Sequence, residues 1–145
     1  MICKSAGIIP VRFTDKTPYF LMLRAYHYWD FPKGRLEKGE DVLSAALREL
    51  KEESGINNIV FTWGKVSIST KPYKTKVDGK NAKKVATYFV AEALSNAVEI
   101  KPNPSTGRLE HEEFRWMTYD EINSTIKLSN RIEKVLDWAN KIIGE

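Results

Sequence analysis

Residues 32–56 read PKGRLEKGEDVLSAALRELKEESGI, and this stretch places Glu49, Glu52 and Glu53 within five positions of one predicted helix. Positions three and four apart lie on the same face of a helix, so the three carboxylates converge on one patch. Like charges at this spacing weaken a helix by about 0.2–0.5 kcal/mol per pair. Arg48 offsets part of the repulsion because it can pair with Glu52, but the crowding still needs an explanation.

The helix itself is predicted over residues 41–54. Gly55 is placed to end it, since glycine readily adopts the left-handed conformation that follows many helices. Apolar residues recur at the spacing of a helical face and predict a buried stripe, made of Leu43, Leu47 and Leu50. The glutamate patch then lies at the margin of the buried side and faces the segment that precedes the helix.

The preceding segment is a loop that contains Gly34 and Gly39. Glycine lets a backbone approach its neighbours closely, so this loop can present carbonyl oxygens to the carboxylates. Clustered carboxylates and a backbone oxygen suit a hard divalent cation, and Mg²⁺ favours sites that it shares with substrate phosphates. A solvated acidic face is the alternative interpretation, and the metal site is the favoured one.

The spacing of the fixed residues carries a family resemblance. Gly34, five residues, Glu40, seven residues and then RELKEESGI at 48–56 resemble the Nudix box, G-x5-E-x7-R-E-U-x-E-E-x-G-U, where U is a bulky aliphatic residue. The resemblance implies an α+β Nudix fold, with a mixed β-sheet sandwiched between α-helices. It also implies hydrolysis of nucleoside diphosphates linked to another moiety, with Mg²⁺ or Mn²⁺ as cofactor.

The same resemblance assigns roles to residues of the box. The metal ligands it implies are the carboxylates of Glu49, Glu52 and Glu53 and the carbonyl oxygen of Gly34. Arg48 would orient Glu49, and Glu40 would lie behind the ligands. Bound metal ions would neutralise polyphosphate charge and activate a water, and a carboxylate would then take the proton of that water.

Three flanking segments resemble the asymmetrical diadenosine tetraphosphate hydrolases within this family. They are YWDFPKG at 28–34, VATYFVAEA at 85–93 and LEHEEFRWM at 109–117. By this resemblance Tyr88 would stack on an adenine, and Glu110, six residues before Trp116, would be a further metal ligand or base. The implied catalytic residues are therefore Glu49, Glu53, Glu110 and Arg48. The predicted substrate contacts are Lys33, Tyr88, His27, Trp29 and Lys83.

Structural interpretations remain open for several of these residues. Tyr88 fits a half-buried strand equally well, and Trp29 fits a role in capping the core. His27 fits an exposed polar position. Lys33, which follows a proline and precedes the predicted metal loop, is favoured as a phosphate contact.

The rest of the chain predicts one domain over residues 1–145, with an α+β architecture. The predicted strands cover 6–13, 18–25, 58–69 with a break at Gly64, 83–94 and 112–119. Residues 103–107 are predicted as a loop. Thr118 begins a short helix, since Thr118 and Glu121 form a capping-box pattern. Apolar residues at helical spacing predict the last helix over 129–143.

The composition bounds the class of protein. Hydrophobic residues make up 42% and charged residues 29% of the 145 residues, which argues against disorder. The single cysteine, Cys3, rules out an internal disulfide and a cysteine-based zinc site. No apolar run is long enough to span a membrane, and no signal peptide is evident. We therefore expect a cytoplasmic protein without a membrane partner, as a monomer or a weak dimer.

The net charge of +4 is concentrated in part in residues 71–84, which contain six lysines. A solvated loop and a rim that attracts phosphate are both open interpretations. The leading functional hypothesis is Mg²⁺-dependent cleavage of a dinucleoside polyphosphate, with diadenosine tetraphosphate split into ATP and AMP. The alternatives are a pyrophosphohydrolase of RNA 5′ ends and a nucleoside triphosphate pyrophosphatase. A nucleotide-sensing module without turnover is disfavoured, because every carboxylate of the box is retained.

Overall fold

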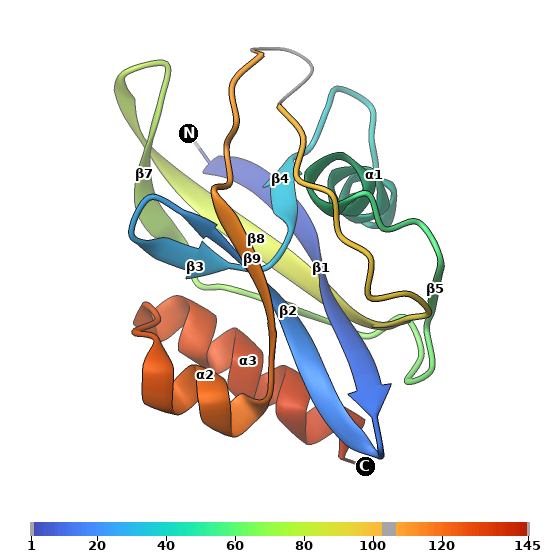
Figure 1. Cartoon of the computed structure of the whole chain (residues 1–145). Coiled ribbons are helices and arrows are strands. Elements are labelled where there is room, and N and C mark those ends of the chain that lie inside the picture. Colours follow the sequence, from blue (N-terminus) through green and yellow to red (C-terminus); the bar gives the residue numbers. More distant parts are fainter. Residues whose placement is uncertain (1, 103–106, 145) are drawn as a thin grey trace.

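The computed structural model describes residues 2–102 and 107–144, so most of the loop predicted at 103–107 lies outside the described residues. Within the described ranges the chain forms nine strands and three helices (Figure 1). In chain order they are β1 (Ile2–Thr14), β2 (Thr17–Ala25), β3 (Tyr28–Asp30), β4 (Lys33–Arg35), α1 (Val42–Ser54), β5 (Ile59–Val60), β6 (Ser67–Ser69), β7 (Tyr73–Val77), β8 (Lys80–Ala93), β9 (Glu113–Met117), α2 (Tyr119–Thr125) and α3 (Asn130–Ile143).

The sheet is mixed, as predicted. Its central path runs β3-β2-β1-β8-β5, while β4 pairs with β1, β9 with β2, and β6 and β7 with β8. The long strands β1 and β8 are parallel, from Ile2 opposite Lys83 to Val11 opposite Glu92. The other strand pairs are antiparallel. Because β1 and β8 are parallel and far apart in sequence, the intervening chain, including α1, crosses from one to the other.

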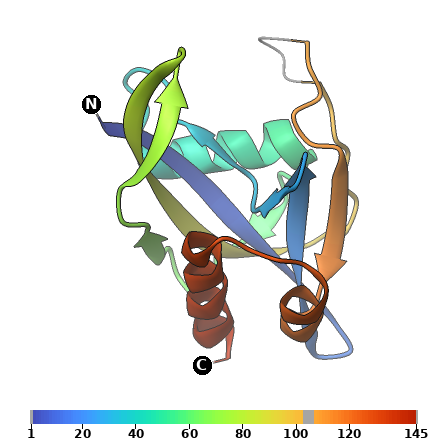
Figure 2. The same cartoon turned by 90° about the vertical axis from the view of Figure 1, so that its left-hand side faces the viewer.

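Helices cover both faces of the sheet, which confirms the predicted sandwich. Helix α1 packs on one face and α2 and α3 pack on the other (Figure 2). Each face has its own apolar core. Leu50 of α1 packs with Ile8 and Ala91 of the sheet. Ile132 and Leu136 of α3 pack with residues from the other face of the same strands. None of the helices in the described part of the chain is long and apolar enough to cross a bilayer.

The ends of α1 agree with the sequence prediction. The Asp41 side chain accepts a hydrogen bond from the Ser44 backbone at 2.7 Å and caps the first turn. Gly55, with φ of 77°, donates to the carbonyl oxygen of Lys51 at 2.8 Å and ends the helix. The predicted second helix and its capping box at Thr118 are also confirmed.

The buried face of α1 differs from the predicted leucine stripe. Leu50 is buried, but Leu47 is 37% exposed. Ala45 and Ala46 occupy the buried positions instead and pack with Ala6. Small side chains let the helix approach the sheet closely. The bulkier Leu47 then lies at the margin of the contact between helix and sheet.

The structure also settles three details of the strands. The predicted break at Gly64 within 58–69 is confirmed, because a turn with Gly64 at φ of 85° separates two short strands, β5 and β6. The lysine-rich segment 71–84 is not a solvated loop, since most of it forms the β7–β8 hairpin. Asp78 and Gly79 make its turn, with φ of 52° and 75°. The three-residue strands β3 and β4 were not predicted, because so short a segment carries no periodic signal.

Candidate active site

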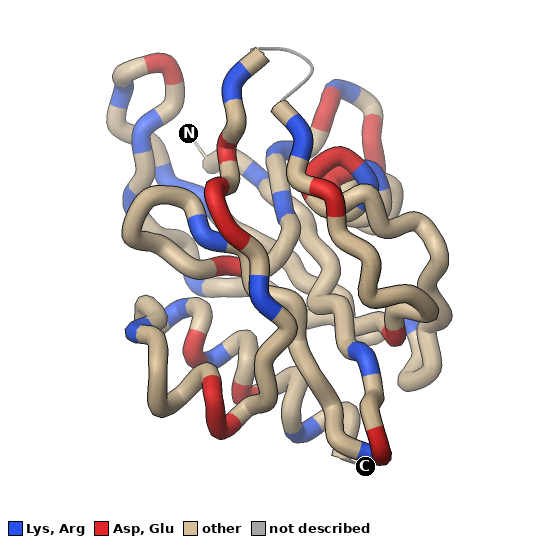
Figure 3. The backbone as a smooth tube through the Cα atoms, viewed as in Figure 1, with Lys and Arg blue, Asp and Glu red and all other residues tan. Residues whose placement is uncertain are grey.

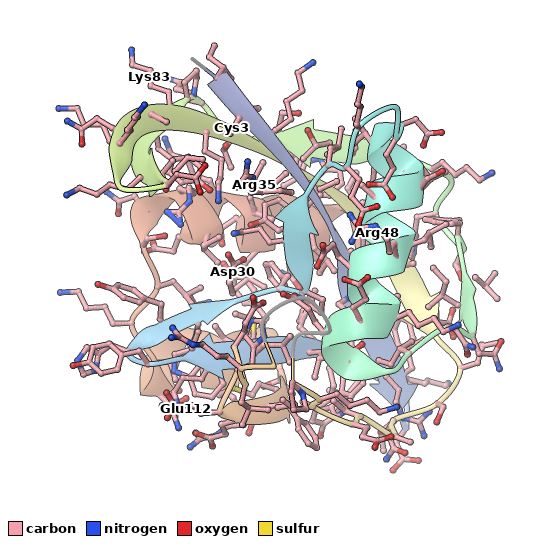
Figure 4. The ribbon with its side chains drawn as sticks, turned by 90° about the horizontal axis from the view of Figure 1, so that it is seen from above. Cys3, Asp30, Arg35, Arg48, Lys83 and Glu112 are labelled. Atoms are coloured by element: carbon pink, nitrogen blue, oxygen red, sulfur yellow. The ribbon has the colours of Figure 1, made fainter. Side chains whose placement is uncertain are left out.

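A cleft of about 650 Å³ lies between α1, β4 and the segment that precedes β9. One wall is acidic, with Glu49, Glu52 and Glu53 from α1 and Glu110 from the segment before β9. The other wall is basic, with Lys33, Arg35 and Lys84. Viewed from above, Arg35 and Asp30 lie between α1, which carries Arg48, and the β7–β8 hairpin (Figure 4). The cleft thus brings a carboxylate cluster and a set of cations face to face.

Arg48 organises the acidic wall. Its Nη1 donates to Glu49 at 2.8 Å and to Glu52 at 3.1 Å. Its Nε and Nη2 donate to the two carboxylate oxygens of Glu40 at 2.8 and 2.9 Å. A further bond runs from Nη2 to the carbonyl oxygen of Arg35 at 3.0 Å, which ties β4 to the helix. The Arg48 guanidinium lowers the pKa of Glu40 to about 2. Arg48 therefore contacts Glu49, the residue that it is predicted to orient.

Gly34 lies directly against the carboxyl group of Glu49. A Cβ added at Gly34 would overlap all three atoms of that carboxyl group, so glycine is the residue that leaves Glu49 in place. Burial raises the pKa of Glu49, and its ion pair with Arg48 opposes this effect. The nearby charges of Glu52 and Glu110 also raise it. These carboxylates are therefore close enough to repel one another across the acidic wall.

Glu53 lies deepest in the acidic wall, with a side chain that is 10% exposed. One of its oxygens accepts a hydrogen bond from the Lys33 backbone at 2.8 Å, and the other lies 3.9 Å from Nδ1 of His111. Burial raises the pKa of Glu53 well above its usual range, and the charges of Glu49 and Glu110 add to the rise. Burial also lowers the pKa of His111, against the pull of Glu110.

The donor set fits a divalent metal ion. The carboxylates of the acidic wall and the Gly34 carbonyl are hard oxygen donors, which Mg²⁺ and Mn²⁺ prefer. Burial disfavours the negative charge of Glu49 and Glu53, and a bound cation would compensate it. Within residues 2–102 and 107–144, no three carboxylate, imidazole or thiolate groups already converge on one point. Arg48 bonds one carboxylate oxygen of Glu49 and one of Glu52.

Lys33 of the basic wall belongs to a partly buried network with Asp30 and Tyr88. Lys33 Nζ lies 3.3 Å from Oδ2 of Asp30, and the Tyr88 hydroxyl donates to Oδ1 of Asp30 at 2.9 Å. The Asp30 charge raises the pKa of Lys33 against the effect of burial. Tyr88 is fully buried, and its ring packs edge-on against Phe31 at 5.9 Å between centroids. The core interpretation of Tyr88 therefore holds, and its ring offers no exposed face for stacking on an adenine.

Replacing Tyr88 with Phe tests this network. The ring stays in the core, but Asp30 loses a donor, so we expect a loss of about 1 kcal/mol in the free energy of unfolding. Because Asp30 holds Lys33, kcat/KM should also fall by about tenfold. Thermal melts and steady-state kinetics measure both effects. Tyr119→Phe is the matched control, since the Tyr119 hydroxyl donates to Asp137 at the surface, away from the cleft. Equal effects of the two variants on kcat/KM would contradict the role of Asp30.

The remaining predicted substrate contacts lie outside the lining of the cleft. His27 is exposed at the turn between β2 and β3, and its ring contacts that of Tyr26, with centroids 3.9 Å apart and the ring planes tilted by 44°. Trp29 is partly buried, and the guanidinium of Arg115 lies 5.2 Å from its ring centroid. Lys83 is exposed on β8.

Sequence reasoning missed Lys84, which lines the cleft next to Lys33 and Arg35. Burial lowers the pKa of Lys84, and the charges of Lys33 and Arg35 lower it further, so the three cations lie close together. Strand alternation separates Lys84 from Lys83 but does not by itself show which of the two lysines enters the cleft. Lys84 shares a strand face with Tyr88, four residues on, whereas Lys83 points to the opposite face. Asp30 and His111 also line the cleft. Both lie in the flanking segments that carry the resemblance, but neither was assigned to the site from the sequence.

The mixed sheet between helices and the glutamate-lined cleft define a fold and site of the Nudix type. A family model described as the NUDIX domain matches residues 1–139, so the chain belongs to the Nudix hydrolase family.

Among its relatives is the asymmetrical bis(5′-nucleosyl)-tetraphosphatase of Caenorhabditis elegans, which is 31% identical over 136 residues. This match covers 92% of the chain and 89% of the relative. The RNA pyrophosphohydrolase of Bartonella henselae is 26% identical over 110 residues, which cover 71% of the chain and 64% of that protein. A crystal structure of a binary complex of the C. elegans Ap4A hydrolase superposes with a TM-score of 0.73 at 25% identity, covering 99% of both chains.

Proposed function

We propose that this chain is a Mg²⁺-dependent hydrolase of dinucleoside polyphosphates that splits diadenosine tetraphosphate into ATP and AMP, with Mn²⁺ able to replace Mg²⁺. The observation that carries the proposal is the two-walled cleft, in which a carboxylate cluster faces Lys33, Arg35 and Lys84. A chain of phosphates needs both cations along its length and a metal site at the bond that breaks. The names of the tetraphosphatase relatives support this substrate class.

Different residues of the cleft have different roles in the proposed reaction. Lys33, Arg35 and Lys84 bind phosphate oxygens along the basic wall. A divalent ion held by the acidic wall and the Gly34 carbonyl would neutralise phosphate charge and lower the pKa of a bound water. Glu49, Glu53 and Glu110 are our candidates for the group that accepts the proton of the attacking water.

Product analysis tests the proposal. We expect the purified chain with Mg²⁺ to convert diadenosine tetraphosphate into equal amounts of ATP and AMP, as resolved by chromatography. Chelation of the metal should abolish turnover, and added Mg²⁺ should restore it. Formation of two ADP molecules, or no turnover, would contradict the proposal. The experiment uses the whole chain, which we treat as one cytoplasmic domain.

A second candidate, hydrolysis at RNA 5′ ends, is favoured by the β7–β8 hairpin. Lys74 and Lys83 lie opposite each other in this hairpin, and Lys76 and Lys80 are also exposed. Basic residues lie along both strands of the hairpin, and the acidic Asp78 lies at its turn (Figure 3). Such a surface attracts the phosphates of a longer nucleic acid. This candidate predicts release of pyrophosphate or phosphate from 5′-triphosphorylated RNA faster than cleavage of any dinucleotide. Nucleoside triphosphate hydrolysis is a third, less favoured activity.

A further inference from the structure

Arg24, at the end of β2, joins three parts of the chain that border the cleft. Its Nε donates to Glu113 at 2.9 Å, and its Nη1 donates to the carbonyl oxygen of Tyr26 at 2.7 Å. Nη1 also lies 3.4 Å from Glu112, whose other oxygen accepts a bond from the Tyr26 backbone at 3.2 Å. We call Arg24, Tyr26, Glu112 and Glu113 the Arg24 cluster. It connects the β2–β3 turn to the start of β9.

The Arg24 cluster adjoins the segment that carries Glu110. Residues 107–112 belong to neither helix nor strand, and β9 begins at Glu113. The Glu112 backbone donates to the carbonyl oxygen of Arg24 at 2.8 Å, which fixes the chain one residue before β9. Glu110 lies two residues earlier, so its Cα is at most about 7 Å from that of Glu112. In the view from above, Glu112 lies at the edge of the molecule beyond Asp30 (Figure 4).

We propose that Arg24 is a positioning residue, which fixes the segment that carries Glu110 and His111 against the acidic wall. This inference rests on the role proposed for Glu110 in hydrolysis. Arg24 does not belong to the lining of the cleft, whereas Glu110 and His111 do. Its effect on the reaction therefore passes through the segment. The contact of His111 with Glu53, at 3.9 Å, is one that a shift of the segment would alter.

The exposure of the Arg24 cluster separates positioning from stability. The side chains of Arg24, Glu113 and Glu112 are 28%, 32% and 52% exposed. Ion pairs at such positions contribute little to the free energy of folding. A catalytic group, in contrast, loses up to about 100-fold in rate when it is displaced by about 1 Å. Removal of Arg24 should consequently affect turnover far more than thermal stability.

A double-mutant cycle tests the inference. We expect Arg24→Met to lower kcat by about tenfold and to change KM by less than about twofold. In a Glu110→Gln background the same change should lower kcat by less than about twofold, because the positioned group is already lost. Arg115→Met is the matched control, since Arg115 pairs with Glu113 at 2.6 Å and is not part of the contacts to Tyr26 and Glu112. It should leave kcat unchanged.

Hydrogen exchange provides a readout that needs no substrate. Arg24→Met should speed amide hydrogen exchange in residues 107–112 and leave exchange in β8 unchanged. Arg115→Met should leave exchange in residues 107–112 unchanged. A loss of kcat by the same factor in both backgrounds would overturn the inference, as would unchanged exchange in this segment. If the wild-type chain fails to cleave dinucleoside polyphosphates, the proposed function fails instead. The cycle is then measured with the phosphoanhydride substrate that the chain does hydrolyse, and exchange still decides the role of Arg24.

Discussion

Replacing Glu53 with Gln is expected to lower kcat by at least about 10²–10³-fold, the largest loss among the single substitutions considered. Glu53 is the most buried residue of the acidic wall. It contacts the Lys33 backbone with one carboxylate oxygen and His111 with the other. Glutamine keeps the shape and can still accept the hydrogen bond from Lys33. It lacks the charge that metal binding and proton transfer require, so the chemical step fails while the geometry persists.

The same substitution should not weaken the fold. A buried carboxylate without a full set of partners is unfavourable, and a neutral amide removes that charge. We therefore expect the metal-free Glu53→Gln variant to melt at the same temperature as the wild type or higher. The control is Glu99→Gln, because Glu99 is exposed and makes one long ion pair to Lys101 at 3.7 Å. If the Glu53 variant keeps full turnover with Mg²⁺, the assignment of the catalytic site is wrong.

The parts of the fold that could be predicted are those encoded by local spacing. The span of α1, the glycine at position 55 and the convergence of Glu49 and Glu53 all follow from residues within two or three helical turns. The helical period fixes these relations before any tertiary contact forms. For the same reason the capping box at Thr118 was predicted correctly.

The parts that could not be predicted depend on contacts across the chain. Whether Lys83 or Lys84 enters the cleft depends on which face of β8 packs against α3, and this follows from the pairing of β8 with β1. The burial of Tyr88 depends on Asp30, 58 residues earlier, which accepts a hydrogen bond from the Tyr88 hydroxyl. Leu47 is exposed because Ala45, Ala46 and Leu50 are the residues of α1 that pack in the core with Ala6 of the sheet. No local pattern contains this information.

Replacing Gly34 with Ala is expected to lower kcat by about 10²-fold while the fold is retained. The new methyl group would overlap the Glu49 carboxyl, which is the far end of a flexible side chain and can move aside without a backbone change. The φ angle of Gly34 is not in the left-handed region, so alanine adds no backbone strain. Alanine also keeps the carbonyl oxygen that is proposed as a metal ligand. The loss would therefore report the displacement of Glu49.

Gly144→Ala is the matched control for the Gly34 variant. Gly144 ends α3 with φ of −83°, and a Cβ there meets the Asn140 carbonyl oxygen at 3.4 Å, far from the cleft in sequence and structure. Steady-state kinetics with Mg²⁺ and thermal melts of both variants measure the effects. Full turnover of Gly34→Ala would mean that Glu49 is not required where it lies against β4. A large drop in melting temperature would instead mean that the backbone, rather than Glu49, gives way. Loss of turnover with an unchanged melting temperature is the outcome that connects Gly34 of β4 to the Glu49 carboxylate of α1.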